Sequence, residues 1–292
     1  MQSTTRGRDV QLTDEIDRNS AHDRERFERE YLYPLKPVIL TDAISHWAAL
    51  GKWTPQFFKS NYGSLVVEVD AESFALGDLI DRVEASTDDR PAPYLRNQAL
   101  ADWPLELSGD VFPMPECTQP NWLESRFFPS GKSLSSPEVY IGGPGARFPT
   151  LHYDGLHTHA FLMQLYGDKE YIALPPDQAR FLYPRDGLAG NRSQIADLLE
   201  PNLEQFPLAE QAKGVRFQLH PGETLFVPSG WWHTARILSP SVTVSINGVN
   251  RANASAFRHD FGAVLAQSSK AKSVVARTGL LVGEAIRLFE WA

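Results

Sequence analysis

Short apolar runs separated by turn residues dominate the chain from residue 138 to about residue 250. Glycine and proline stand between these runs, as at 142–145 and 221–222, and both residues favour turns. The pattern predicts eight strands, at 139–141, 150–153, 159–165, 169–174, 215–219, 224–227, 234–238 and 242–246. Short strands at regular spacing predict a mainly β fold, the double-stranded β-helix or jelly roll of the cupin kind.

The segments before this region mix strand and helix patterns, which predicts an α/β decoration on the N-terminal side of the barrel. Apolar runs predict short strands at 37–40, 65–69 and 94–96. Apolar residues at helical spacing predict a helix over 76–85. Thr54 followed by Pro55 is typical of a helix start, with a hydroxyl cap and proline at the first helical position. The charge-rich stretch 14–30 predicts a solvated helix.

After residue 250 the apolar residues recur at helical spacing in two stripes. The first stripe contains Phe257, Phe261, Val264 and Leu265, and the second contains Val274, Leu281, Val282, Ala285, Leu288 and Phe289. We therefore expect a polar N-terminal tail and helix (1–30), a cupin domain (31–250) with its barrel mostly at 138–250, and a C-terminal helical segment (251–292). The two stripes would pack on the barrel of the same chain or on a second copy.

The composition is that of an ordinary globular protein, with 42% hydrophobic and 22% charged residues among 292. The net charge of -8 argues against a nucleic-acid partner, because phosphate contacts need a basic face. The single cysteine, Cys117, excludes an internal disulfide and fits a reducing compartment. No apolar run resembles a signal peptide or is long enough to cross a bilayer. We therefore expect a cytoplasmic location and no membrane association.

Two histidines and one carboxylate stand out within the strand-rich region. His152 lies in the predicted strand 150–153 and Asp154 follows it directly, so extended backbone would point both side chains to the same side. His233 ends the block 228–233, a turn that delivers an imidazole to the start of the next strand. Alone, the first pair is equally compatible with a hydrogen bond at a sheet edge, and His233 with an aromatic core. Together they form the 2-His-1-carboxylate set that holds Fe(II) on one face and leaves the other face open.

Two further histidines, His157 and His159, follow closely. A His-x-His pair also belongs to another cupin metal pattern, which adds a glutamate a few residues later. The first glutamate here, Glu170, comes too late for that pattern. We therefore expect His159 to line the barrel and His157 to lie near its mouth, as a substrate contact or as a rim residue.

These motifs resemble those of the Jumonji-C family of Fe(II)- and 2-oxoglutarate-dependent oxygenases. The resemblance is closest to its small hydroxylase branch, which includes the asparaginyl hydroxylase that regulates the hypoxia factor. It covers most of the chain, through 139–145, 152–154 and 164–176, and its most specific element is 221–233. The resemblance implies Fe(II) as cofactor and 2-oxoglutarate and O2 as co-substrates, with release of succinate and CO2.

The resemblance also implies a co-substrate site. Lys169 matches the lysine that pairs with the distal carboxylate of 2-oxoglutarate, and Tyr94 matches the tyrosine that supports the same carboxylate. Ser245 and Asn247 match a hydroxyl and an amide that point into the barrel. Thr150 lies one residue after the position of a further hydroxyl in the family.

Physical chemistry supports the role of Lys169 independently. A lysine inside a β-barrel is costly to bury unless an anion meets it, and the alternative is a lysine that extends to the barrel rim. The sequence departs from the family in one feature. The barrel-facing asparagine expected between Asp154 and Lys169 has no counterpart here; the residues nearby are Ala160, Leu162 and Gln164.

The substrate follows less directly from the sequence. Members of the family hydroxylate protein side chains, demethylate lysine, or modify nucleic acids and small molecules. The sequence shows no reader domain or zinc cluster, so we expect hydroxylation of a protein, a peptide or a small amino-acid-like molecule instead of chromatin demethylation. The candidate substrate contacts are His157, Arg96, Asn97, Arg147 and Trp231.

Two other function classes remain open. A cupin metalloenzyme that needs no 2-oxoglutarate would use Lys169, Tyr94 and Asn247 only as structural residues. A non-catalytic cupin binding module would be expected to have lost a metal ligand first. Related small hydroxylases dimerise through C-terminal helices, so the resemblance also implies a homodimer.

Overall fold

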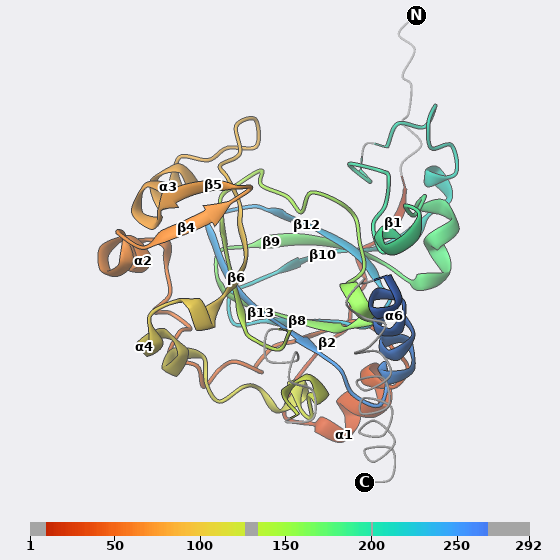
Figure 1. Cartoon of the computed structure of the whole chain (residues 1–292), viewed down its shortest axis with the longest axis horizontal. Helices are drawn as coiled ribbons and strands as arrows, with labels where there is room; N and C mark the ends of the chain where they lie inside the picture. Colours follow the sequence, from red (N-terminus) through yellow and green to blue (C-terminus); the bar gives the residue numbers. More distant parts are fainter. Residues whose placement is uncertain (1–9, 126–133, 200, 268–292) are drawn as a thin grey trace, which may run out of the picture.

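Two β-sheets packed face to face form the centre of the molecule (Figure 1). The computed structural model describes residues 10–125, 134–199 and 201–267. One sheet has the strand order β1-β10-β9-β12, and the other has the order β2-β3-β11-β8-β13-β7-β6. Neighbouring strands within the barrel are antiparallel and mostly non-consecutive, which is the arrangement of a jelly roll. The predicted double-stranded β-helix is confirmed.

The barrel strands lie close to their predicted positions. They are β7 (Glu138–Gly142), β8 (His159–Tyr166), β9 (Lys169–Leu174), β10 (Lys213–Leu219), β11 (Thr224–Val227), β12 (Trp232–Ile237) and β13 (Ser241–Gly248). The strand predicted at 150–153 is wrong. Its backbone bonds are divided between two partners, since His152 pairs with His233 while Tyr153 N–H donates to the Asn191 carbonyl. No continuous ladder forms on either side.

The register between β9 and β12 determines which side chains face the barrel interior. Lys169, Tyr171 and Ala173 alternate along β9 and share one face. Tyr171 and Ala173 belong to an apolar cluster that draws residues from both sheets, so this face is the inner one. The partners of the three residues on β12 are, in the same order, Ile237, Ala235 and His233.

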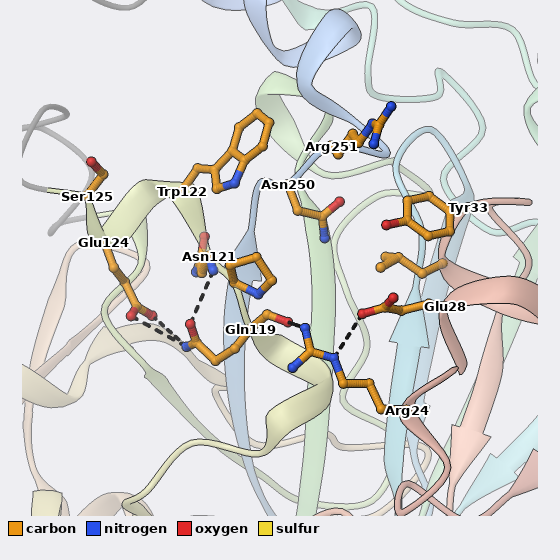
Figure 2. A pocket seen from close by; sticks show the side chains of 12 residues that line it. Arg24, Glu28, Tyr33, Gln119, Asn121, Trp122, Glu124, Ser125, Asn250 and Arg251 are labelled. Carbon is orange, nitrogen blue, oxygen red and sulfur yellow. Dashed lines mark hydrogen bonds and ion pairs between the residues drawn. The ribbon is translucent and has the colours of Figure 1, made fainter. Parts of the chain in front are cut away.

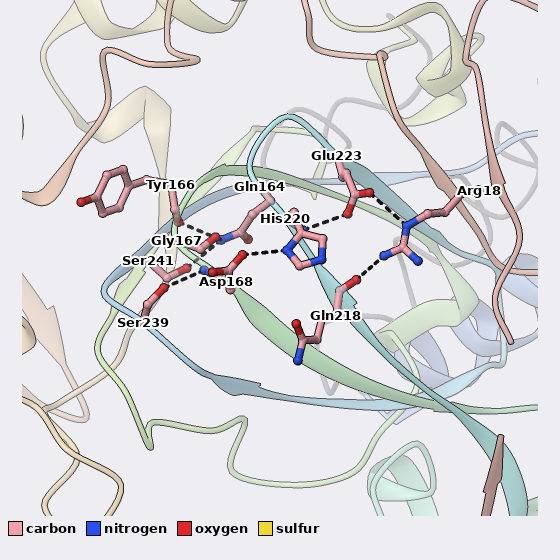
Figure 3. A network of polar contacts seen from close by, with 10 residues as sticks. All are labelled: Arg18, Gln164, Tyr166, Gly167, Asp168, Gln218, His220, Glu223, Ser239 and Ser241. Carbon is pink, nitrogen blue, oxygen red and sulfur yellow. Dashed lines mark hydrogen bonds and ion pairs between the residues drawn. The ribbon is translucent and has the colours of Figure 1, made fainter. Parts of the chain in front are cut away.

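The turn just before Lys169 is fixed by a polar network at the end of β8 (Figure 3). The Gln164 amide donates to the carbonyls of Tyr166 and Gly167 at 2.8 and 2.7 Å. Gly167 has φ of +68°, and a Cβ there would lie 2.0 Å from the Pro240 carbonyl oxygen, so only glycine fits. The Asp168 N–H donates to the Ser239 hydroxyl at 2.9 Å. These contacts fix where β9 begins and therefore where Lys169 enters the barrel.

The N-terminal segment joins the barrel as strands, and the helix predicted over 14–30 is wrong. β1 (Gln11–Thr13) pairs with β10, and β2 (Arg18–Asn19) pairs with β3 (Val38–Leu40). Helical structure begins only at α1 (Arg24–Phe27) and continues as a π-helix (Glu28–Leu32). The buried apolar residues of the segment, Phe27, Tyr31 and Leu32, lie in this last part. The earlier residues have no apolar stripe to dock a helix, so their backbone bonds go to strands instead.

The decoration on the other side of the barrel matches its prediction. It contains α2 (Pro55–Tyr62), the hairpin β4 (Val66–Val69) and β5 (Glu72–Ala75), α3 (Leu76–Glu84) and β6 (Leu95–Ala99). The Thr54 hydroxyl accepts from the Phe57 N–H at 3.0 Å, as expected of a helix cap. The apolar stripe of α3 is fully buried in the large cluster on the outer face of the seven-stranded sheet.

The connections around the barrel are irregular. Between β6 and β7 the described residues form α4 (Leu105–Ser108) and four 3-10 turns, at Leu100–Asp102, Gly109–Val111, Glu116–Thr118 and Trp122–Glu124. Further 3-10 turns lie at Gly155–His157, Pro176–Phe181, Gly187–Ala189 and Ala209–Gln211. The last three belong to the connection from β9 to β10, which packs its apolar residues on Ile172, Leu174 and Trp232. This connection therefore covers the outer face of the four-stranded sheet.

The helix α6 (Ala254–Gln267) lies beside the Gly155–His157 turn, opposite the side that carries α2 and α3 (Figure 1). Phe257 of the first predicted stripe packs into a cluster with Leu123 and Val249 of its own chain. The second predicted stripe, from Val274 to Phe289, lies outside the described residues. Among the helices of the described ranges, none has the length and apolar character needed to cross a membrane.

Candidate metal and co-substrate site

His152 and His233 are neighbours through a single antiparallel bridge. The His152 N–H donates to the His233 carbonyl at 3.1 Å, and the His233 N–H donates back at 2.6 Å. The two imidazole ring centroids are 4.6 Å apart. Asp154 places Oδ2 3.9 Å from His233 Nε2. One ligand atom from each of the three residues lies within 4.8 Å of the others, so the structure brings together the three residues selected from the sequence.

Backbone carbonyls orient both imidazoles. His152 Nδ1 lies 2.9 Å from the Thr150 carbonyl oxygen, and His233 Nδ1 lies 3.1 Å from the Trp231 carbonyl oxygen. A carbonyl only accepts, so each Nδ1 carries the hydrogen and each Nε2 keeps a free lone pair. A hydrogen bond from the nitrogen that does not bind the metal is usual for a metal-binding histidine, because it fixes the tautomer and the ring orientation.

The protonation state of His152 also fits a metal. Burial, and next the proximity of His233, lowers the pKa of His152, so the ring is neutral near pH 7. Neutral imidazoles and an ionised carboxylate are the forms that bind a divalent cation. Two free Nε2 atoms with one carboxylate on a common side match the donor set of Fe(II) oxygenases. The residues present therefore fit Fe(II).

The metal-ligand group opens into a pocket of about 410 Å³. Thr150, Ser245 and Asn247 line this pocket, as expected for co-substrate contacts. Asn247 stands directly across from Ala160 in the register of β13 with β8. Asn247 therefore presents an amide beside Ala160, one of the residues near the missing asparagine, and both line the pocket.

Lys169 lies at the deep end of the barrel and is only 1% exposed. Its Nζ donates to the Tyr94 hydroxyl at 3.0 Å and lies 5.3 and 5.8 Å from the ring centroids of Tyr94 and Tyr140. Within the described ranges Lys169 has no ion-pair partner, and burial lowers its pKa to about 7. An anion beside this amine would offset the cost of burying its charge, so the residues also fit a dicarboxylate.

Phe148 stands between the metal ligands and this deep end. Its ring centroid lies 5.4 and 6.4 Å from those of His152 and His233, and 5.9 Å from that of Tyr94. Phe148 also lines the pocket. Its ring therefore lies beside both groups, while Lys169 and Tyr94 themselves are not among the residues that line the pocket.

The five candidate substrate contacts divide into two groups. Arg96 and Asn97 line the pocket. Arg147 does not, because it pairs with Asp197 at the surface. Trp231 is also outside, since its indole N–H donates to the Leu35 carbonyl at 2.7 Å and its ring faces a different groove. The sequence pattern did not distinguish the two groups, because all five flank motifs that do form the site.

His157 is likewise absent from the pocket lining, and its predicted contact with substrate stays a prediction. Its ring stacks on Tyr153 with centroids 4.7 Å apart, and Nδ1 lies 3.3 Å from the Ser229 hydroxyl. Nε2 lies 3.7 Å from Asp260 on α6. The residue therefore joins the segment of Asp154, the turn before His233 and the C-terminal helix. His159 supports the same turn, since its Nδ1 accepts from the Ser229 N–H at 3.0 Å.

The turn after Asp154 is strained and is held by α6. Leu156 and His157 have φ of 58° and 51°, the left-handed region that non-glycine residues rarely adopt. The buried amide of Asn253 donates to the His157 carbonyl at 3.0 Å and to the Gly248 carbonyl at 3.0 Å. Leu156 packs against the cluster under α6. These contacts keep Asp154 in place.

Other pocket residues were not predicted. Glu138 accepts from the Tyr140 hydroxyl at 2.7 Å and from the Asn97 amide at 3.1 Å. Glu138 and Tyr140 alternate on β7, which pairs with the strand of Ser245. This alternation could have identified them as pocket residues from the sequence. Asn191 and Arg192 also line the pocket, but they come from the irregular connection between β9 and β10. No periodicity marks them, and only the tertiary structure brings them to His152.

A second pocket, of about 640 Å³, lies away from these ligands between the α1 region and the segment 119–125 (Figure 2). Arg24 spans it, donating to Glu28 at 2.9 Å and to the Gln119 carbonyl at 3.4 Å. Its lining contains none of the candidate metal or co-substrate residues. We therefore assign the metal and co-substrate chemistry to the pocket at His152.

Comparison with known proteins identifies the family to which the chain belongs. A family model described as a cupin-like domain matches residues 24–248. This is most of the chain, and the protein belongs to the cupin-like domain family. The match spans the barrel, all three candidate metal ligands and the decoration around β6.

The individual relatives are more distant. Lysine-specific demethylase JMJ30 of Arabidopsis thaliana is 29% identical over 255 residues, covering 82% of this chain and 56% of that protein. Bifunctional arginine demethylase and lysyl-hydroxylase psr-1 of Caenorhabditis elegans is 25% identical over 250 residues, with 76% and 57% covered. tRNA wybutosine-synthesizing protein 5 of Mus musculus is 24% identical over 249 residues, with 77% and 74% covered. The chain spans about half the length of the first two.

The lowered pKa of Lys169 predicts proton-linked binding of 2-oxoglutarate. Its amine titrates near pH 7 in the ligand-free protein, and a bound carboxylate would raise that pKa. Above pH 7 binding must therefore take up a proton, and the Kd should rise by up to about tenfold per pH unit. Calorimetry of the Zn(II)-loaded protein between pH 7 and 9 measures this. Lys169→Arg, which stays charged, is the control with a flat profile; a flat wild-type profile contradicts the assignment.

The support of Asp154 by α6 predicts that Asn253→Ala weakens metal binding. The variant loses the amide that holds the His157 carbonyl, which should raise the Kd for Co(II) about tenfold, as loss of an outer contact typically does. Absorption spectroscopy of the Co(II) complex gives the Kd. Asn121→Ala is the matched control, because Asn121 is a buried amide that bonds Asn247 and Val249 but not the turn after Asp154. If Asn253→Ala and Asn121→Ala have the same Kd for Co(II), α6 does not support the site.

Proposed function

We propose that this protein is an Fe(II)- and 2-oxoglutarate-dependent dioxygenase that hydroxylates a protein side chain or a small amino-acid-like molecule. One observation carries the proposal: the His152, Asp154 and His233 group opens into the same barrel that buries Lys169, whose amine has no ion-pair partner among the described residues. The names of two relatives, a lysine demethylase and a bifunctional arginine demethylase and lysyl-hydroxylase, support oxidative chemistry on side chains.

The residues of the pocket and of the barrel interior would have separate roles in this reaction. His152, Asp154 and His233 would hold iron from one side and leave the pocket side free. Lys169 and Tyr94 would orient the distal carboxylate of 2-oxoglutarate, with Ser245, Asn247 and Thr150 along the pocket wall. Bound iron, 2-oxoglutarate and O2 supply the oxidising chemistry, with release of succinate and CO2. The apolar residues of the barrel interior exclude water from the reacting groups.

The surroundings of the pocket favour a peptide substrate over a small molecule. A second groove of about 650 Å³ adjoins the pocket, and Arg96 and Pro149 line both. An extended chain placed in this groove would pass the entrance of the pocket. The net charge of -8 favours a protein over a nucleic acid, although one relative is named for a tRNA modification. The single cysteine, which is buried, supports the cytoplasm as the location.

Each of the two alternative classes leaves part of the site without a role. A cupin metalloenzyme without 2-oxoglutarate would leave its amine buried without a ligand, a costly arrangement that serves no purpose. A non-catalytic binding module has no need for three metal-binding groups on one side. Both alternatives are therefore tested by the same substitutions.

Asp154→Ala should abolish succinate formation, because iron loses its only carboxylate ligand. Lys169→Ala should raise the KM for 2-oxoglutarate at least tenfold, since the buried anion loses its charged partner. Mass spectrometry of succinate, with and without a peptide library, measures both effects and reports any peptide that gains an oxygen atom. Asp168→Asn, an exposed carboxylate at the closed end of the barrel, is the control that keeps activity. Wild-type turnover by Asp154→Ala would refute the iron site.

We also propose that the protein is a homodimer joined through its C-terminal helices. On α6, Val264 is 42% exposed and available for such a contact. Light scattering at micromolar concentration should give twice the mass of one chain, and Val264→Asp should lower it. A wild-type monomer would contradict this assembly.

A further inference from the structure

Tyr171 carries a buried hydroxyl that nothing in the described ranges satisfies. The residue is 0% exposed, and its hydroxyl has no hydrogen-bond partner among the described residues. Leaving such a group unpaired is unfavourable, and an orphan polar atom in a packed interior calls for a ligand or a water. Its ring is held rigidly, stacked on Phe217 with centroids 5.9 Å apart and an interplanar angle of 11°.

The position of Tyr171 points to the co-substrate. It follows Lys169 by two residues on β9, so both side chains enter the barrel from the same face. The next inward residue, Ala173, pairs with the metal-ligand candidate His233. Along the strand, Tyr171 therefore lies between Lys169 and the metal end. A molecule that reaches from Lys169 to the metal ligands would run along the strand face that carries Tyr171.

Small residues surround Tyr171 on the inner face of this strand pair. Ala235 pairs with Tyr171 across β12, and both Ala235 and Ala173 are small residues of the interior cluster. Tyr94, which bonds Lys169, is close enough to Tyr171 that it adds to the effect of burial in raising the pKa of Tyr171. The phenol is therefore protonated at every physiological pH and acts as a hydrogen-bond donor.

We propose that the Tyr171 hydroxyl is a third donor to the distal carboxylate of the dicarboxylate co-substrate, beside Lys169 and Tyr94. The proposal rests on the proposed function. Lys169 and Tyr94 bond each other, whereas the Tyr171 hydroxyl has no partner among the described residues and can donate. Hydrogen bonds to ionised acceptors are stronger than neutral ones, so the hydroxyl gains its partner only when the anion binds.

Tyr171→Phe removes the hydroxyl and nothing else. Calorimetry of the Zn(II)-loaded protein should show a Kd for 2-oxoglutarate raised about tenfold, in the range expected for one bond to a charged group. The Kd for oxalate, which chelates the metal but is too short to reach the deep end of the barrel, should stay within about twofold. The melting temperature of the ligand-free variant should be unchanged or higher, because no existing bond is lost.

Tyr94→Phe is the matched comparison, because its hydroxyl is already bonded to Lys169. This variant should lose both ligand-free melting temperature and 2-oxoglutarate affinity. An unchanged Kd for 2-oxoglutarate in Tyr171→Phe would show that a buried water satisfies the hydroxyl, and would overturn the proposal alone. A lower ligand-free melting temperature, or an equal loss of oxalate affinity, would also overturn it. Failure of the wild type to bind 2-oxoglutarate would instead remove the proposed function as well.

Discussion

The pairing of β9 with β12 is the constraint on which the site depends. It places His233 opposite Ala173 and Lys169 opposite Ile237, so that a metal ligand and a buried amine face the same interior along one strand pair. A shift of one residue in this pairing would move the inward-facing side chains of one strand to the outer face of the sheet. The turn at Gly167, where only glycine fits, fixes the start of β9 and protects this register. The distance between the two ends of the site is thus set by backbone pairing and not by flexible side chains.

The same site draws on elements that contribute no ligand. The bridge between His152 and His233 lies outside a regular ladder, so other contacts must hold it. His157, Ser229 and Asn253 supply them, together with a left-handed turn that is unfavourable in isolation. The C-terminal helix therefore belongs to the support of the metal ligands. This connection gives α6 a role even within one chain, separate from any part in dimerisation.

Much of this arrangement could be predicted from the sequence, for identifiable reasons. The apolar runs of β7, β8, β9, β11 and β13 are clear in the sequence because both faces of these strands are buried. The block ending at His233 combines turn, strand and ligand in one run. Segment 14–30 was mistaken for a helix because charge density does not reveal strand pairing with β3. The place of His157 depends on a residue 103 positions away, Asp260, as its contact distance shows. Tyr171 has no distinguishing mark in the sequence, because the apolar pattern of β9 does not reveal that its hydroxyl lacks a partner among the described residues.

The most direct test of the central claim is an anaerobic titration of the metal-free protein with Fe(II) and then with 2-oxoglutarate. The account predicts that a visible metal-to-ligand charge-transfer band appears only when both are present, and that Asp154→Ala shows none. Such a band reports a 2-oxo acid bound to iron at the His152, Asp154 and His233 group. Binding of Fe(II) without the band on adding 2-oxoglutarate would contradict the account and would favour a cupin metalloenzyme of another kind.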